Sequence, residues 1–287
     1  MRTSHMNICH TCFAISLLFL YLPANAADIA TDVRNGGARS IENGGHFEVG
    51  MIAGYVHNPY LNSETEDDVI ATFDLGGEYR HRRLFLEASQ GSQDGFNMGY
   101  FLWQNDDWSV DLLAASITGT ISDRDDKNID SEDNEAQRNR TLLENDTFHV
   151  GAGVRITRYI NDYVVQYRLI SDIFDNNGVI STLRMGRGWQ VRNWNYQAII
   201  SAEYTSKKTN QYRVGVSQQE QTTRFPFYQP DASISYSALI GATRPLSENW
   251  LLRGFAGVIL LPPEVKASPL VSDHNYSIAV ATLVYVF

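Results

Sequence analysis

In the stretch from residue 275 to residue 287, every second residue counted back from Phe287 to Ala279 is apolar or aromatic. Because successive side chains of a β-strand point to opposite faces, this pattern predicts a strand with one apolar face. The members of that face, counted back by twos from the last residue, are Phe287, Tyr285, Leu283, Ala281 and Ala279. Such a strand is typical of a closed membrane barrel, whose last strand pairs with its first while the outer face meets lipid. The final strand of a soluble β-sandwich is the alternative.

The first 26 residues read as a secretory signal. Arg2 precedes an apolar run over residues 13–22, and Ala24-Asn25-Ala26 gives a small-x-small cleavage site. We therefore expect residues 1–26 to be removed. Both cysteines, Cys9 and Cys12, lie inside this segment, so the mature chain is expected to have neither a disulfide nor thiol chemistry. Residues 27–45, with two Gly-Gly pairs and little periodicity, are expected to form a mobile lead-in.

The charge of the chain argues against one class of partner. The net charge is −10 for the full sequence and becomes −11 without residues 1–26, which contain one arginine and no acid. A nucleic-acid-binding protein would show a basic patch, so we expect no nucleic acid as partner. No apolar run of about 20 residues follows the signal, and no transmembrane helix is expected.

Alternation recurs along the whole chain. It predicts an all-β fold over residues 46–287, a transmembrane antiparallel up-and-down β-barrel of about 12 strands. The even number of strands and their lengths suit a single-chain membrane barrel. The expected strands are 46–55, 69–80, 84–89, 96–102, 108–114, 148–157, 163–169, 178–191, 194–204, 233–243, 250–260 and 275–287.

Short and long connections between the expected strands alternate along the chain. A soluble sandwich has no structural reason for this alternation. Every second connection, after the second, fourth, sixth, eighth and tenth strands, is a short turn rich in Asn, Asp, Ser and Arg. The intervening connections are mostly long, notably 119–146 and 205–231. Aromatic residues mark the expected membrane interfaces. One girdle holds Tyr79, Trp108, Tyr163, Trp194, Trp250 and Phe287, and the other holds Tyr55 and Tyr204.

Many charged residues fall on the inward face of these strands. They could pair and fill the lumen, or line a narrow pore, and we favour a filled or nearly filled barrel. The set is Glu48, Asp74, Glu78, Arg80, Glu87, Asp111, Arg155, Arg168, Glu203 and Arg253.

Two features of the sequence could be sites of chemistry. The acidic segment 123–135 offers many oxygen ligands, but it lacks the turn glycine and closing glutamate of a calcium loop, so a solvated surface loop is expected. His149 and His46 have no accompanying nucleophile motif, and a lumen-lining or hydrogen-bonded role is expected for each. The sequence therefore predicts no catalytic residues, no metal site and no cofactor.

Residues 54–63, 83–91, 212–219 and 267–271, together with the closing residues 285–287, carry motifs that resemble the MipA/OmpV family of outer-membrane proteins. The resemblance spans most of the mature chain in order and includes residues 83–91, which are similar to the family's third strand. It departs from the family at Val214, which lengthens one motif, and in the acidic insert. The family-like positions are Tyr55, Pro59, Tyr60, Tyr212, Gly215, Val216, Ser217, Ser268 and Pro269.

The resemblance implies a scaffold in the Gram-negative outer membrane that is linked to murein-remodelling enzymes, with a murein hydrolase or peptidoglycan synthase as partner. Residues 279–287 further resemble the signal read by the outer-membrane assembly machinery, so that machinery and membrane lipid are also expected partners. A small outer-membrane channel and a surface adhesin remain alternatives, and a hydrolase at the barrel rim is the least favoured.

Overall fold

The computed structural model describes residues 43–61, 68–89, 95–116, 134–143, 150–172 and 178–287. The expected signal, residues 27–42 of the lead-in, residues 123–133 of the acidic segment and His149 lie outside these ranges. The first strand begins at Gly44, two residues before the expected start. Within the described ranges no helix is both long and apolar enough to cross a membrane.

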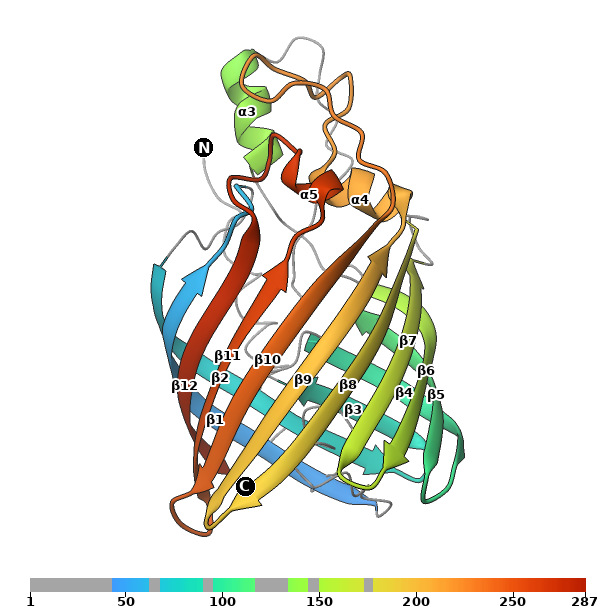
Figure 1. Cartoon of the computed structure of the whole chain (residues 1–287), viewed down its shortest axis with the longest axis vertical. Coiled ribbons are helices and arrows are strands. Elements are labelled where there is room, and N and C mark those ends of the chain that lie inside the picture. Colours follow the sequence, from blue (N-terminus) through green and yellow to red (C-terminus); the bar gives the residue numbers. More distant parts are fainter. Residues whose placement is uncertain (1–42, 62–67, 90–94, 117–133, 144–149, 173–177) are drawn as a thin grey trace, which may run out of the picture.

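The described chain forms one closed antiparallel barrel of 12 strands, which confirms the predicted fold class (Figure 1). Each strand pairs with its neighbours in sequence, and β1 pairs with β12 to close the barrel. The strands are β1 Gly44–His57, β2 Asp68–His81, β3 Leu84–Ser89, β4 Gly95–Gln104, β5 Trp108–Ser116, β6 Val150–Ile160, β7 Tyr163–Asp172, β8 Val179–Val191, β9 Trp194–Thr205, β10 Ser233–Pro245, β11 Trp250–Leu260 and β12 Asn275–Val286.

The closing pair has a continuous register. Met51 of β1 lies opposite Leu283 of β12, and Tyr55 lies opposite Ala279. Beyond the end of β12, the backbone N–H of Phe287 donates to the carbonyl oxygen of Phe47 over 2.9 Å. The apolar face read from the sequence therefore continues across the seam on the outside of the barrel.

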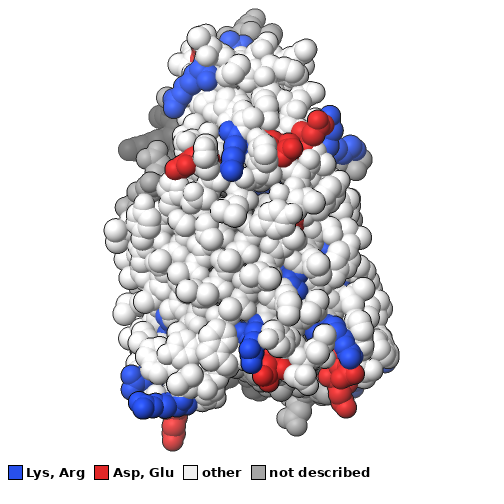
Figure 2. All heavy atoms as spheres, viewed as in Figure 1, with Lys and Arg blue, Asp and Glu red and all other residues white. Residues whose placement is uncertain are grey.

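Alternation along each strand separates an apolar outside from a polar inside. On β2, Val69 and Phe73 are 76% and 74% exposed, whereas Asp74 and Glu78 are buried. On the face in view, Figure 2 shows a broad band of the barrel with few charged atoms, and most charged side chains lie toward its two ends. A water-soluble protein rarely exposes so large an apolar surface, and lipid is the solvent that suits it.

The two ends of the barrel differ in the length of their connections. At the short-turn end the strands are joined by tight hairpins, such as residues 82–83, 161–162 and 192–193. The first residue of each of these hairpins, Arg82, Asn161 and Arg192, has positive φ, which suits the twist of a two-residue turn. The long-loop end carries the remaining connections, as the parity of the loops predicted.

Three short helices lie among the described parts of the long loops, where the sequence pattern predicted irregular chain. They are α3 Glu135–Leu143, α4 Lys207–Val214 and α5 Pro263–Lys266. All three gather at one end of the barrel (Figure 1). With 9, 8 and 4 residues, they are too short to show the repeated apolar stripe from which a helix is recognised in a sequence.

Candidate functional site: a polar lumen beneath a cap

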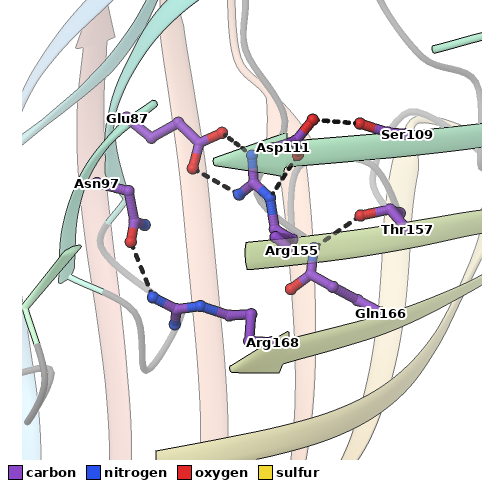
Figure 3. A network of polar contacts seen from close by, with 8 residues as sticks. All are labelled: Glu87, Asn97, Ser109, Asp111, Arg155, Thr157, Gln166 and Arg168. Carbon is purple, nitrogen blue, oxygen red and sulfur yellow. Dashed lines mark hydrogen bonds and ion pairs between the residues drawn. The ribbon is translucent and has the colours of Figure 1, made fainter. Parts of the chain in front are cut away.

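The inner wall of β3, β5 and β6 holds a buried ion-pair network (Figure 3). Arg155 donates from both terminal nitrogens to the two carboxylate oxygens of Glu87, each over 2.8 Å. Its Nε donates to Oδ2 of Asp111 over 2.9 Å, and Oδ1 of Asp111 accepts from Ser109 over 2.5 Å. All four residues are buried. The network satisfies most of the hydrogen-bonding capacity of a guanidinium that has lost its hydration.

Two further polar contacts continue the network over β4 and β7. Arg168 donates from Nη2 to Oδ1 of Asn97 over 3.0 Å, and Gln166 donates from Nε2 to Thr157 over 3.3 Å. The Arg155–Glu87 and Arg168–Asn97 contacts each pass over two intervening strands. They therefore cross part of the lumen and do not follow the wall from one strand to the next.

A second ion pair lies beside the closing seam. Arg253 of β11 donates to both carboxylate oxygens of Glu48 of β1, over 3.0 and 3.1 Å, and this contact passes over β12. Nε2 of His46 lies 3.2 Å from Oε1 of Glu48, so His46 is hydrogen-bonded as expected. Asp74 is buried nearby, and its Oδ1 accepts no hydrogen bond from the described residues.

Two aromatic rings lie inside the barrel next to Arg80 and Arg155. The rings of Phe85 and Phe101 lie 4.6 Å apart, and Cζ of Arg80 lies 4.2 Å above the Phe101 ring. Gly99 makes room for this packing, because a Cβ at that position would lie 2.2 Å from Cζ of Phe85. Phe85 and Phe101 form one buried cluster with Leu113, Ala115 and Ile170.

All ten inward charges expected from the sequence are placed on the lumen side. Eight of them are buried, and Glu48 and Glu203 are partly exposed. Strand parity also places Ser109, Thr157, Gln166 and Gln197 on the inward face, and all four are buried. Sequence reasoning missed five further residues of the interior, although the same parity gives the signal that could have identified them. These are Phe85, Asn97, Phe101, Thr182 and Arg184.

The long-loop end is covered by packed chain, which we call the cap: residues 58–61, 206–232 and 261–274 together with α3. Ser268 donates from its hydroxyl to the carbonyl oxygen of Val214 over 2.6 Å and accepts from the N–H of Leu270 over 3.1 Å. The N–H of Leu61 donates to the carbonyl oxygen of Leu270 over 2.9 Å. Ser268 therefore joins the end of α4 to a segment that also pairs with residues 59–61.

Helix α3 is fastened to the cap by polar and apolar contacts. Glu135 accepts from the N–H of Thr223 over 2.6 Å, and this hydrogen bond lowers the pKa of the Glu135 carboxyl. Thr222 donates to Oδ1 of Asn139 over 2.6 Å. Leu142 packs in a buried cluster with Val216, Phe225 and Leu270. A second cluster, of Val214, Leu261 and Val265, packs against Tyr60, and burial raises the pKa of that tyrosine.

The structure brings most of the family-like positions together in the cap. Pro59 and Tyr60, the segment 212–217 and the pair Ser268-Pro269 come from three separate connections and meet there. Gly215 caps α4, where a Cβ would lie 2.3 Å from the carbonyl oxygen of Gln211. Two positions have other surroundings: Tyr55 faces outward on β1, and the side chain of Ser217 is exposed.

The expected assembly residues lie on the outer face of β12. Ala279, Ala281 and Phe287 are exposed, and Leu283 and Tyr285 are partly exposed. The Phe287 ring makes an edge contact with Tyr285, the centroids 4.8 Å apart. Among the described residues, no group of three His, Cys, Asp or Glu side chains is arranged to hold a metal ion.

Comparison with known proteins places the chain in a family. The sequence model of the family described as MltA-interacting protein MipA matches residues 49–287. No curated protein sequence matches the chain significantly.

Solved structures similar to the chain are bacterial outer-membrane barrels of low sequence identity. A bacterial polysaccharide outer-membrane secretin is 12% identical with a TM-score of 0.41, over 86% of this chain and 100% of that one. An outer-membrane channel from Pseudomonas putida F1 is 8% identical with a TM-score of 0.41, over 92% and 100%. The channel DcaP of Acinetobacter baumannii is 8% identical with a TM-score of 0.36, over 86% and 97%.

Proposed function

Because the chain belongs to the MltA-interacting protein MipA family, we propose that this Gram-negative outer-membrane β-barrel is a scaffold that holds a murein-remodelling enzyme at the membrane. The family and the barrel fold are not of an enzymatic kind. The proposal concerns what the barrel does beyond residing in the outer membrane. Its predicted partner is a murein hydrolase, with a peptidoglycan synthase as a further candidate.

The observation that carries the proposal is the state of the inward charges. Arg155, Glu87 and Asp111 pair with one another away from solvent, and the buried Arg253 pairs with Glu48, whose side chain is 12% exposed. Charged groups that select ions in a pore are exposed to the passing solution, whereas these five side chains bind one another inside the barrel. Inward charges that are paired in this way support a structural role more than a conducting one.

The short-turn end is the surface that a periplasmic enzyme would reach, because single-chain outer-membrane barrels have their short turns on that side. Exposed charges of both signs lie there, including Arg82, Arg83, Asp106, Arg192 and Glu248. Tight turns make a small surface, and interfaces of small area are typical of weak or transient contacts. We therefore expect a salt-sensitive contact that needs crosslinking to survive purification.

Site-directed photocrosslinking in whole envelopes tests the proposal. A photoreactive amino acid replaces Arg82 or Arg192 at the short-turn end, and a matched variant carries it at Phe227, an exposed residue of the cap. We expect a murein hydrolase or synthase to crosslink from the short-turn end and not from Phe227. The scaffold proposal fails if neither turn position captures a murein enzyme, or if capture is equal from the cap.

The channel alternative has its own measurement. Purified barrel in a planar bilayer is expected to give no steady unitary currents, because the described lumen is crossed by buried side chains. Steady currents that change in size in an Asn97→Ala variant would place ion flow along the lumen and would replace the scaffold proposal with a channel.

A further inference from the structure

Three arginines at the short-turn end stack on aromatic rings on the outside of the barrel. Cζ of Arg158 lies 4.9 Å from the centroid of Trp108. The corresponding distances are 5.0 Å for Arg187 and Tyr163, and 5.5 Å for Arg244 and Trp194. Contacts of this length are cation–π interactions, and they hold each guanidinium against the face of a ring.

The pairs share one place in the barrel architecture. Trp108 lies directly opposite Arg158 across β5 and β6, and Tyr163 lies opposite Arg187 across β7 and β8. The β9–β10 register ends with Thr243 opposite Asn195, so its next step sets Arg244 opposite Trp194. The same arrangement thus recurs at every second strand pair over half of the barrel. Residues in this position lie in the aromatic girdle, at the depth of lipid headgroups.

Only part of the positive charge is neutralised by the protein. Arg158 lies 2.7 Å from Oδ2 of Asp107, and Arg187 lies 3.6 Å from Oδ2 of Asp162. No described acidic side chain pairs with Arg244. The side chains of Arg158 and Arg187 are 30% and 48% exposed, and Arg244 is exposed too. Some N–H donors of each guanidinium therefore remain available to a ligand outside the barrel.

The chemistry of a stacked guanidinium defines that ligand. A ring beneath the planar group fixes its orientation, and its edge presents two parallel N–H donors that match two oxygens of a phosphate. At the headgroup depth of a bilayer, the phosphate belongs to a lipid. A ligand that offers only an ammonium group or a sugar hydroxyl would not require three guanidinium groups held in fixed orientations.

We propose that the Arg158–Trp108, Arg187–Tyr163 and Arg244–Trp194 pairs bind the phosphates of anionic phospholipids in the leaflet next to the short turns. The bound lipids form a partial ring against β5–β10. This inference does not depend on the scaffold function, because it concerns the lipid partner of the barrel wall and not a protein partner of the turns.

Quenching of tryptophan fluorescence by brominated lipids measures the binding on the intact barrel. All five tryptophans are described, and all lie on strands at or near the short-turn girdle, so they report on lipid at this depth. Barrel is reconstituted in phosphatidylcholine with brominated phosphatidylglycerol or brominated phosphatidylcholine as the probe. Wild-type barrel is expected to prefer phosphatidylglycerol. A charge-assisted contact between one stacked guanidinium and a lipid phosphate contributes roughly tenfold in affinity, so the triple variant R158Q/R187Q/R244Q should lose that preference by about tenfold or more.

The matched control removes the same charge without touching a stack. Arg82, Arg83 and Arg192 are exposed at the same end, in the turns, where solvent and salt screen their charge, and R82Q/R83Q/R192Q is expected to keep the preference within about twofold. R158K/R187K/R244K, which keeps the charge but loses the planar fork, should fall between wild type and the glutamine variant. Heat-modifiable gel migration confirms that every variant is folded. An unchanged preference in the stacked-pair variant, or an equal loss in the control, would overturn the proposal.

Discussion

Arg155 on β6 and Glu87 on β3 form a bidentate ion pair across two intervening strands, with both N–O distances at 2.8 Å. The two residues are 68 positions apart in sequence, and neither is accessible to solvent. The pair fixes the inner faces of strands that share no backbone hydrogen bonds. A contact of this kind stabilises one arrangement of the barrel interior, because any shift of β3 relative to β6 would leave buried charge without a partner.

Substitution of Arg155 tests how strongly the network holds the barrel. Arg155→Ala leaves Glu87 and Asp111 buried with uncompensated charge, and we expect a loss of about 3–5 kcal/mol in the free energy of unfolding. Urea unfolding in detergent micelles, followed by tryptophan fluorescence, gives the value. Arg192→Gln in an exposed turn is the control and should change it by less than about 0.5 kcal/mol.

A compensated variant separates charge from packing at the same site. Arg155→Met combined with Glu87→Gln and Asp111→Asn removes the buried charges together and should recover most of the stability lost by Arg155→Ala. If the compensated variant is as unstable as Arg155→Ala, shape and not charge balance is what the network supplies.

Gly153 on β6 tests the close approach of two strands. A Cβ there would lie 1.8 Å from the carbonyl oxygen of Leu169, and backbone cannot move aside as a side chain can. Gly153→Ala should therefore destabilise the barrel by about 3 kcal/mol or more. Gly254→Ala is the matched control, because its nearest contact is 3.6 Å away. The folded fraction in unheated gel samples gives the comparison, and equal fractions for the two variants would contradict this account.

Ser268→Ala tests the closure of the cap. The substitution leaves the Val214 carbonyl and the Leu270 N–H without a buried partner, which costs about 1–3 kcal/mol at that place. Because the strands are untouched, the loss should appear as faster proteolysis and hydrogen exchange over residues 261–274, with the unfolding midpoint of the barrel unchanged. Ser217→Ala, at an exposed cap position, is expected to leave both readouts near the wild-type value.

Phe287→Ala tests the expected assembly role of the last strand. Its side chain is 65% exposed and contacts other rings only at the outer face, so the purified variant should lose about 1 kcal/mol of stability or less. The amount of barrel recovered from the outer membrane should nevertheless fall several-fold. Leu260→Ala removes a similarly exposed apolar side chain at the opposite end and should leave the yield unaltered. Equal yields for the two variants would remove the assembly role.

Strand number and orientation followed from local pattern alone. A period of two assigns each residue of a strand to one face, so Val69 and Phe73 were predicted outside and Asp74 and Glu78 inside without knowledge of any neighbour. The β4 strand is an exception to the period of two. Its register shifts between Phe101 and Trp103, and both Leu102 and Trp103 are exposed as a result. An irregularity in pairing belongs to two strands, and one strand's sequence does not show it.

The structure of the cap could not be predicted from sequence pattern, for a different reason. The motif positions Tyr60, Val216 and Ser268 were singled out only by family resemblance, and nothing in their spacing indicated that their loops meet. Loops have no period from which a partner could be inferred, and the helices within them are too short to form an amphipathic repeat. Their convergence becomes visible only once the barrel has brought the ends of β1, β9 and β11 to one rim.

The sequence by itself determined that this chain is a lipid-facing barrel with charged residues inside, because the solvent on each face selects side chains one residue at a time. Only the tertiary structure decided that Arg155 meets Glu87 and that Arg253 meets Glu48. Those partners are set by strand tilt, stagger and closure, which are properties of the whole sheet and are encoded in no single strand.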